Sequence, residues 1–468
     1  MTFDKEKAKF HTDQIDLHNQ ALKDMIEEGE APPSPGPVIV VSNEDELDQA
    51  LKVGGQIELS VGSSFSKSYD YLRDETFIRG QGNNQIIGLG APALDVPLSL
   101  YNLSLRDVEL QTSKHDILML LGRNDTSQVE LDKVPSRIVI EGLKSTGHRG
   151  KRGIEVNAED VVIKNVDIRD IYSPAKIDSQ CICVLNSPGN IHISDSHLEG
   201  AVENMMVGGD AMKLQNTRPT NITVIRTVFT KNLAWKGDAA IPVKNLFELK
   251  DGINVLVRDC EFSNSWVSAQ DGYCFTFTPR RGGEVLNVMV ENANVKDVSA
   301  IANIMGVDDN YATLRRTQTS FKGGTFKTNK AQMGGRGWFA LVTNGPEYLI
   351  IDGVDATIDG SCFIGIEGTS ERAKVDQFHL INSKWNYGSY GIRLGGYSHG
   401  DNQLGVVKDI KIEGCTIQGA HSSFRARYPN NTYVSNMSAE REREVDAKQA
   451  LAAFDREMKE AVKRAMIE

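Results

Sequence analysis

The sequence predicts an all-β fold: a single-stranded right-handed parallel β-helix with three short strands per coil and about twelve coils. The first indication is an apolar pattern, φ-x-φ-x-x-φ-x-φ with φ apolar or small, that recurs about every thirty residues. Repeats of roughly 20 to 50 residues are typical of solenoids. The second is the spacing of two within the pattern, which is the period of a strand rather than the 3.6 of a helix. The third is another alternating segment ahead of many copies, which supplies a third strand.

Each copy predicts two strands joined by a sharp bend, because the two-residue step moves the chain to a new face. The copies begin at Leu103, Ile138, Val161, Ile191, Ile222, Val255, Val288, Thr319, Leu349, Phe378 and Ile410. The third strand is expected just before the next copy, at alternating pairs such as Met212 and Leu214, Phe247 and Leu249, Phe275 and Phe277, and Ile392 and Leu394. Stacked at about 4.8 Å, the coils would form a rod on the order of 60 Å long.

The composition fits one long domain with small ends, because a solenoid of 468 residues grows by adding coils. The net charge of −11 argues against nucleic-acid binding, which needs clustered Lys and Arg. No segment approaches about 18 consecutive apolar residues, so membrane insertion is not expected. The start of the chain lacks the apolar run of a secretory signal, which predicts synthesis in a cytoplasm. Cys260 and Cys415 fall on inward positions, so we expect buried, reduced thiols.

The N-terminal part divides into three predicted segments. Residues 1–30 form a helical docking arm, whose apolar stripe on one side is made of Phe10, Leu17, Ala21, Leu22, Met25 and Ile26. Residues 31–37 are a stiff, Pro-rich linker. Residues 38–65 read as strand, helix, strand, with Ser42 as the expected helix N-cap, and would cover the first coil as a cap.

The β-helix is expected over 66–435, and a charged, Ala-rich segment at 436–468 follows it. Within that segment an apolar seam is spaced alternately by four and three residues, at Ala447, Leu451, Phe454, Met458, Ala461 and Ala465. Such a seam favours either a coiled coil between chains or one amphipathic helix folded over the last coil. Both interpretations bury the seam.

A resemblance rests on the run VKNLFELK at 243–250, followed by Trp266, the tripeptide at 270–272 and the TPR run at 278–280. With the cap and coils, residues 38 to 435 resemble the pectate-lyase-like right-handed β-helix superfamily, and most of all bacteriophage tailspike and virion β-helix proteins. That group includes polysaccharide lyases, glycoside hydrolases and spikes that bind or cut surface glycans. Phage spikes are typically homotrimers attached to the particle by their N-terminal part, so the resemblance implies the same arrangement here.

Candidate site residues come from stacking the repeats, since outward positions on neighbouring coils lie about 5 Å apart. Aligning the strands ahead of each copy places Lys213, Glu248 and Thr276 in one column, with Lys250 in the next. Asp271 and Arg280 come from adjoining loops. Glycan cleavage needs two carboxylates, or a basic residue beside a neutralised carboxylate, so Glu248, Asp271 and Arg280 are the catalytic candidates. The alternative is an ordinary ion pair between Glu248 and Lys213 across two coils.

Lys213, Lys250, Trp266 and Tyr397 are the candidate substrate-binding residues, the aromatic ones because their rings can stack on sugars. The catalytic motifs of pectate lyases and polygalacturonases are missing from this sequence, so those families' residues cannot be transferred. No metal site or cofactor is expected, although the lyase alternative would admit Ca²⁺.

The leading hypothesis is a homotrimeric, virion-associated, tailspike-like protein. It would contact virion proteins through its N-terminal helix and a bacterial surface polysaccharide through its flank. The alternatives are a polysaccharide lyase or glycoside hydrolase of the superfamily, and a non-enzymatic capsid or tail decoration protein.

Overall fold

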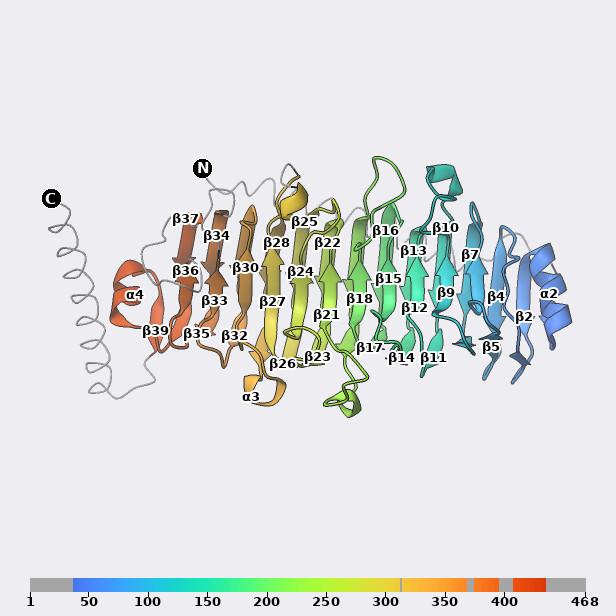
Figure 1. The fold of residues 1–468 in the computed structure, drawn as a ribbon, viewed down its shortest axis with the longest axis horizontal. Coiled ribbons are helices and arrows are strands. Elements are labelled where there is room, and N and C mark those ends of the chain that lie inside the picture. The colour runs from blue at the N-terminus through green and yellow to red at the C-terminus, as the bar shows by residue number, and fades with distance from the viewer. Residues whose placement is uncertain (1–36, 312–313, 368–373, 395–406, 435–468) are drawn as a thin grey trace.

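The computed structural model describes residues 37–311, 314–367, 374–394 and 407–434. The predicted docking arm (1–30), nearly all of the linker (31–37), the C-terminal helix (436–468) and Tyr397 lie outside the described residues. The described chain forms an elongated stack of coils (Figure 1). All neighbouring strands within its three long sheets run parallel, which confirms the predicted β-helix.

The three sheets take one strand each from a coil. The first sheet contains β1 (Ile39–Val41), β2 (Gly55–Leu59), β4 (Thr76–Gly80), β7 (Tyr101–Arg106), β10 (Ser136–Glu141), β13 (Glu159–Lys164), β16 (Gly189–Ser194), β19 (Thr220–Ile225), β22 (Gly252–Arg258), β25 (Val285–Glu291), β28 (Gln318–Lys322), β31 (Tyr348–Asp352), β34 (Val375–Ile381) and β37 (Val407–Glu413). The second contains β3 (Ser64–Phe65), β5 (Gln85–Gly88), β8 (Glu109–Thr112), β11 (Lys144–Thr146), β14 (Asp167–Ile171), β17 (His197–Gly200), β20 (Val228–Thr230), β23 (Glu261–Ser265), β26 (Asn294–Val298), β29 (Thr325–Thr328), β32 (Asp355–Thr357), β35 (Lys384–Asn386), β38 (Thr416–Gln418) and β39 (Thr432–Val434). The third contains β6 (Leu94–Val96), β9 (Ile117–Leu121), β12 (Arg152–Val156), β15 (Gln180–Val184), β18 (Glu203–Val207), β21 (Asn245–Leu249), β24 (Tyr273–Phe277), β27 (Ala300–Met305), β30 (Ala340–Thr343), β33 (Ile364–Ile366) and β36 (Ile392–Leu394).

The repeat read from the sequence is the register of the first sheet. Leu103, Ile138 and Val161 pair in one column, and the column continues through the later copies to Ile410. Since each of the 11 strands of the third sheet belongs to its own coil, the described chain contains 11 complete three-stranded coils, close to the predicted number.

The sharp bend between the first and second sheets depends on one residue per coil in the left-handed backbone region. The bend positions all have positive φ and are Asp107, Gly142, Asn165, Asp195, Arg226, Asp259, Asn292, Gly323, Gly353, Asn382 and Gly414. Asn, Asp and Gly tolerate this conformation best. One of these three residue types occupies each of these bend positions except the one held by Arg226.

The interior is a continuous apolar column with an aromatic stack in its second half. Phe229 and Phe262 stack with ring centroids 4.7 Å apart, and the series continues through Phe321 to Trp385. The described cysteines are all free and buried, as predicted. None of the helices in the described ranges combines the length and apolarity that crossing a membrane would take.

Helices cover the two ends of the described rod (Figure 1). At one end α2 (Glu44–Val53) lies beyond β2 and buries Leu47, Ala50 and Leu51. Its N-cap is Asn43, whose side chain accepts a hydrogen bond from the Glu46 backbone N–H, so the expected N-cap, Ser42, was wrong by one residue. Near the other end lies α4 (Ser422–Arg427). The short α3 (Lys330–Met333) and the 3₁₀ turns η1 (Leu131–Lys133), η2 (Leu233–Trp235) and η3 (Asp309–Tyr311) lie in loops.

Candidate functional site

A groove of about 750 Å³ crosses the outer face of the third sheet. Its floor includes one outward column, in which Leu120, Glu155 and Met206 lie on β9, β12 and β18. Cys183 occupies the same column on β15 and packs with Leu185 and Met206 into a small apolar cluster outside the main core. The floor therefore has an apolar strip beside polar groups.

The walls of the groove are loops at the two ends of the third-sheet strands. One wall holds residues 123–125, Asp210 and Arg281, and the other holds Lys151 and residues 176–178. Asp210 joins three loops of the first wall. It accepts a hydrogen bond from Asn124 Nδ2 at 3.2 Å and forms an ion pair with Arg281, whose Nη1 lies 2.7 Å from Asp210 Oδ1. The loops of Arg281 and Asn124, which are 71 and 86 residues from Asp210 in the sequence, are thereby held together along one wall of the groove.

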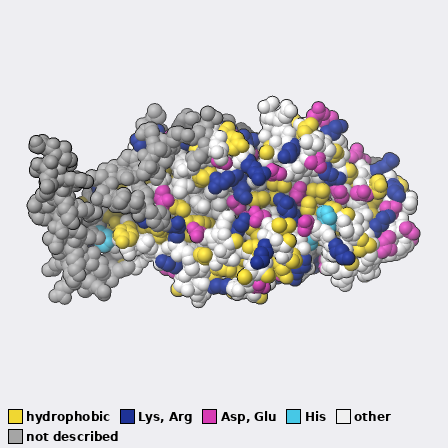
Figure 2. All heavy atoms as spheres, viewed as in Figure 1, with side chains coloured by type: hydrophobic (Ala, Val, Ile, Leu, Met, Phe, Trp, Pro, Cys, Tyr) yellow, Lys and Arg dark blue, Asp and Glu magenta, His cyan; other side chains and the backbone are white. Residues whose placement is uncertain are grey.

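The groove is more cationic than the chain as a whole. Figure 2 shows Lys and Arg side chains gathered over the middle of the face on which the third sheet lies. Five carboxylates line the groove: Asp116, Asp125, Glu155, Asp178 and Asp210. Six cations line it: Arg123, Lys151, Arg152, Lys176, Lys250 and Arg281. In a chain of net charge −11, this local balance favours ligands that carry hydroxyl or acidic groups.

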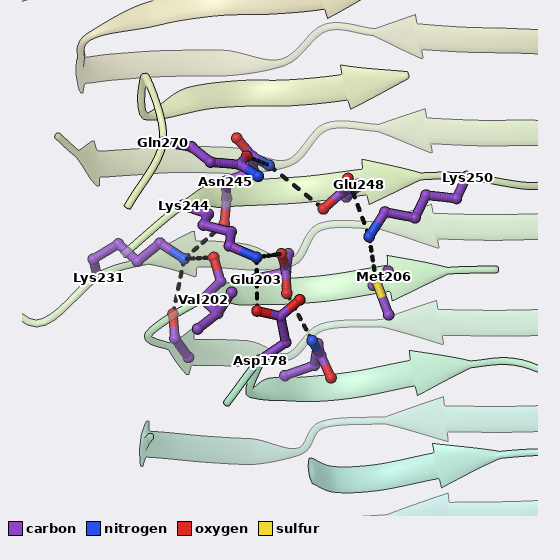
Figure 3. Close-up of polar contacts among 12 residues, drawn as sticks. Asp178, Val202, Glu203, Met206, Lys231, Lys244, Asn245, Glu248, Lys250 and Gln270 are labelled. Carbon is purple, nitrogen blue, oxygen red and sulfur yellow. Dashed lines mark hydrogen bonds and ion pairs between the residues drawn. The ribbon is translucent and has the colours of Figure 1, made fainter. Parts of the chain in front are cut away.

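A polar cluster beside the groove joins residues of β18 and β21 and of nearby loops (Figure 3). Glu203 is completely buried at the start of β18, where Gln180 Nε2 donates a 2.7 Å hydrogen bond to Glu203 Oε2. Lys244 Nζ lies 3.9 Å from Glu203 Oε1 and 2.6 Å from Asp178 Oδ1. Asp178 and Gln180 line the groove, so the cluster connects the buried Glu203 carboxyl with the groove wall.

Glu248 projects outward from the middle of β21 and pairs in register with Met206 and Thr276. Lys250 Nζ lies 3.5 Å from Glu248 Oε1, and Asn245 Nδ2 donates to Glu248 Oε2 at 3.4 Å. The side chain is nearly buried. Lys250 itself lines the groove, so Glu248 lies directly behind a groove residue.

Burial raises the pKa of Glu203 to about 8, and the negative charges of Glu248 and Asp178 act in the same direction. The nearby ammonium of Lys244 opposes the shift. Burial therefore favours the protonated form of the Glu203 carboxyl, which can donate a hydrogen bond. Pairs of carboxyl groups in contrasting environments are a common arrangement for acid–base chemistry.

Lys231 is a second buried ionisable group next to this cluster. It follows β20 and is 1% exposed. Its Nζ lies within 2.8 Å of Gly200 O, Asn204 Oδ1 and Asn245 O, and 3.1 Å from Val202 O. Burial lowers the pKa of Lys231 to about 7, and the charge of Glu203 opposes that shift. This side chain ties together the corners of two coils.

The structure brings together only part of the predicted site. Glu248 and Lys250 do lie side by side, and Lys250 faces the groove. Asp271 is half exposed and lies 3.7 Å from Arg336 Nε, whereas Arg280 donates to Pro279 O. These two residues flank β24, and a five-residue strand separates its ends by about 16 Å. Glu248, Asp271 and Arg280 therefore do not converge as expected.

The predicted position of Lys213 is wrong. We expected a strand at Met212 and Leu214, but the third-sheet strand of that coil is β18 (Glu203–Val207), with Met205 and Val207 facing inward. Lys213 lies in the following loop, where its backbone N–H donates to Asn186 Oδ1 at 2.9 Å. Glu248 therefore has Lys250 as its ionic neighbour, and the alternative interpretation, an ion pair with Lys213, is also wrong.

Trp266 does not present its ring to a sugar. It is 3% exposed and packs with Ala201, Trp235, Val243 and Met333 in a separate apolar cluster. Tyr397, the other aromatic candidate, is outside the described residues. Over the described ranges, no group of three or more His, Cys, Asp or Glu side chains is arranged to hold a metal ion.

Sequence reasoning missed Glu203, Lys231 and Lys244. A signal did exist for Lys231, because it stands two residues after Phe229, at an inward position of the repeat where a charge is unusual. Glu203 could be found only by placing the third strand of its coil correctly.

No protein-family model matches the chain, and no curated protein matches it significantly. Solved structures do match. A mutant tailspike of E. coli bacteriophage HK620 in complex with a pentasaccharide has a TM-score of 0.51 and 11% identity, over 83% of this chain and 64% of the tailspike chain. Another mutant of that tailspike, in complex with a hexasaccharide, has a TM-score of 0.51 and 12% identity, over 86% and 75% of the two chains.

An exopolygalacturonase from Thermotoga maritima also matches, with a TM-score of 0.42 and 11% identity over 80% of this chain and 96% of the enzyme. The matching solved structures thus include phage tailspikes and an exopolygalacturonase. At these identities the likeness to the two tailspike structures shows the fold alone.

Proposed function

We propose that this protein is a phage virion-associated, tailspike-like protein that binds a bacterial surface polysaccharide in the groove of the third sheet. The observation that carries the proposal is the groove itself. Its volume of about 750 Å³ lies within the roughly 300–1,000 Å³ typical of ligand sites. An apolar strip between charged walls suits sugars, whose rings have apolar faces and hydroxyl edges.

The proposal includes a homotrimer held on the particle through its N-terminal segment. That part draws support from the resemblance of the sequence to phage spikes and from the sequence of the arm and linker. Sedimentation of the full chain should show a trimer, and a monomer would contradict this part.

Filling the groove should weaken polysaccharide binding. Met206→Trp places a bulky ring on the floor between the two walls, and we expect the Kd to rise by about tenfold or more. The measurement is binding of the full chain to purified capsular and lipopolysaccharide preparations from a panel of bacteria. Val228→Trp, on the outer side of the second sheet, is the matched control. Equal binding by both variants, or no binding by the parent chain, would contradict the groove as the site.

Cleavage of the polysaccharide is a second candidate function, favoured by the neighbouring carboxyls of Glu203 and Glu248. A protonated acid beside a second carboxylate is what hydrolysis of a glycosidic bond requires. Each of the two contacts a groove-lining residue: Glu248 Oε1 lies 3.5 Å from Lys250 Nζ, and Glu203 Oε2 accepts from Gln180 Nε2 at 2.7 Å.

If the protein cleaves its ligand, Glu248→Gln should reduce the release of oligosaccharides about a hundredfold, because the substitution removes a charge but keeps the shape. Chromatography of the products measures the release. Glu261→Gln, an exposed change on the second sheet, is the control and should leave it unchanged. Release at the parent rate by the Glu248 variant would reject Glu248 as catalytic.

A further inference from the structure

The apolar lining of the third-sheet groove is aliphatic. Of the described residues that line it, the large apolar ones are Ile117, Leu120, Ile177, Leu185 and Met206. None of the described lining residues is Phe, Tyr or Trp, so they offer no flat ring on which the face of a sugar could stack. A ligand in this groove therefore makes its apolar contacts with branched or flexible aliphatic groups.

The exposed parts of these side chains are small and separate. Ile177, in the loop before β15, is 38% exposed, and Leu120, on β9, is partly exposed. Met206 exposes only 5% of its surface and packs with Cys183. In the floor column Glu155 lies between Leu120 and Cys183, so a charged residue interrupts the apolar surface. Each exposed apolar spot is therefore closer in size to a methyl group than to the face of a sugar ring.

We propose that the groove selects polysaccharides whose sugars carry methyl groups, in the form of 6-deoxyhexoses or acetyl substituents. The inference rests on the proposed function, since it concerns the ligand of the same groove. Both kinds of sugar present a CH₃ group beside a polar ring, and this combination matches small aliphatic spots among charged walls. An unsubstituted hexose presents hydroxyl groups at all of these places.

Two physical effects give the selectivity. A methyl group that covers Leu120 or Ile177 removes apolar surface from water, which is worth about fourfold in Kd for each fully covered methyl. A hydroxymethyl group in the same place would lose its contacts with water, and an aliphatic side chain returns no hydrogen bond. Lys176 lines the same wall as Ile177, so the hydroxyl groups of a methyl-bearing sugar still find a polar partner nearby.

Saturation-transfer NMR tests the proposal, because it shows which protons of a bound glycan contact the protein. The probes are oligosaccharides released from those polysaccharides of the bacterial panel that bind the full chain. We expect their methyl protons to receive the strongest saturation. The signals of 6-deoxyhexose and acetyl methyl groups are resolved from each other, and mild alkali removes acetyl esters but not acetyl amides, so the source of the methyl group is identified.

Two substitutions in the groove provide the second arm of the test. Ile177→Ser and Leu120→Ser should each raise the Kd about fourfold and reduce the saturation of the methyl protons. Leu341→Ser is the matched control and should bind as the parent chain does. Leu341 lies on β30 in the same outward column of the third sheet, but it does not line the groove. Circular dichroism checks the folding of all three variants.

The outcomes separate this inference from the proposed function. Binding of a polysaccharide that has no methyl-bearing sugar would overturn the inference and leave the proposed function intact. Methyl protons that are saturated less than the ring protons would do the same, and so would equal Kd values for both groove variants and the control. If the chain binds no polysaccharide of the panel, the proposed function is contradicted, and the inference is overturned with it.

Discussion

Replacing Lys231 by methionine is expected to lower the free energy of unfolding by about 3–5 kcal/mol. The Nζ group lies against three backbone carbonyls, of Gly200, Val202 and Asn245, and the side-chain oxygen of Asn204. Methionine fills a similar volume but donates no hydrogen bond, so each of these buried oxygens loses the bond from Nζ, although Val202 O still accepts from the backbone N–H of Asn245. Each unsatisfied buried acceptor costs about 1–3 kcal/mol. The lost bonds connect the β17–β18 corner with the strand of the next coil, so we expect cooperative loss of the middle of the rod.

Urea unfolding followed by circular dichroism measures this effect through the midpoint and the slope. Lys296→Met, an exposed change on β26, is the matched control and should stay within about 0.5 kcal/mol of the parent protein. A Lys231→Met protein as stable as that control would mean that the buried ammonium contributes no net stability. Its desolvation would then cancel its hydrogen bonds.

The repeat predicted most of the fold because each coil obeys the same local chemistry. Alternating apolar residues identify the first two strands, and Asn, Asp or Gly marks the bend, as at Asp107 and Asn165. The third strand was harder to place, because loops of different length separate it from the next copy. In the coil of β18 the sequence offers two alternating segments, and Met205 and Val207 rather than Met212 and Leu214 face the core.

A column of asparagine residues along the first sheet was also visible in the sequence, as an Asn repeated at the period of the coils. Asn190, Asn221, Asn254 and Asn287 stand at equivalent positions of four successive coils, and each donates a side-chain hydrogen bond to the coil before it, at 2.9–3.1 Å. All four have positive φ. A column of identical polar residues at the repeat period indicates an amide ladder along the rod, which adds hydrogen bonds between coils that apolar periodicity does not reveal.

The site was less predictable than the fold, since it depends on loops. Glu248 and Lys250 were found because both belong to the repeat. Asp271 and Arg280 were assigned to the same site because they lie in loops adjoining the aligned strands, although β24 lies between them. The groove walls join residues far apart in the chain, such as Asn124 and Asp210, through loops that follow no period. Their pairing requires the three-dimensional register of the coils.

The pH dependence of stability should report the buried carboxyl of Glu203. Its pKa in the folded protein is about 8, against 4.5 for an unperturbed carboxyl, so the folded state binds the proton more tightly. Protonation therefore adds stability that is fully present below pH 4.5 and is lost as the pH rises through 8. Between pH 6 and pH 9 the loss attributable to Glu203 should be about 2–3 kcal/mol.

The comparison that isolates this effect is parent protein against Glu203→Gln, by urea unfolding at several pH values. Glutamine cannot ionise, and it keeps an oxygen that can accept from Gln180 Nε2, as Glu203 Oε2 does at 2.7 Å. The parent protein should lose more stability than the variant on going from pH 6 to pH 9. Since Glu203 also raises the pKa of Lys231, the difference includes the coupling between these two groups. Parallel curves of unfolding free energy against pH would mean that the Glu203 carboxyl is ionised throughout. Lys244 would then stabilise its charge, and burial would not keep it neutral. In that case Glu203 could not serve as an acid beside Glu248.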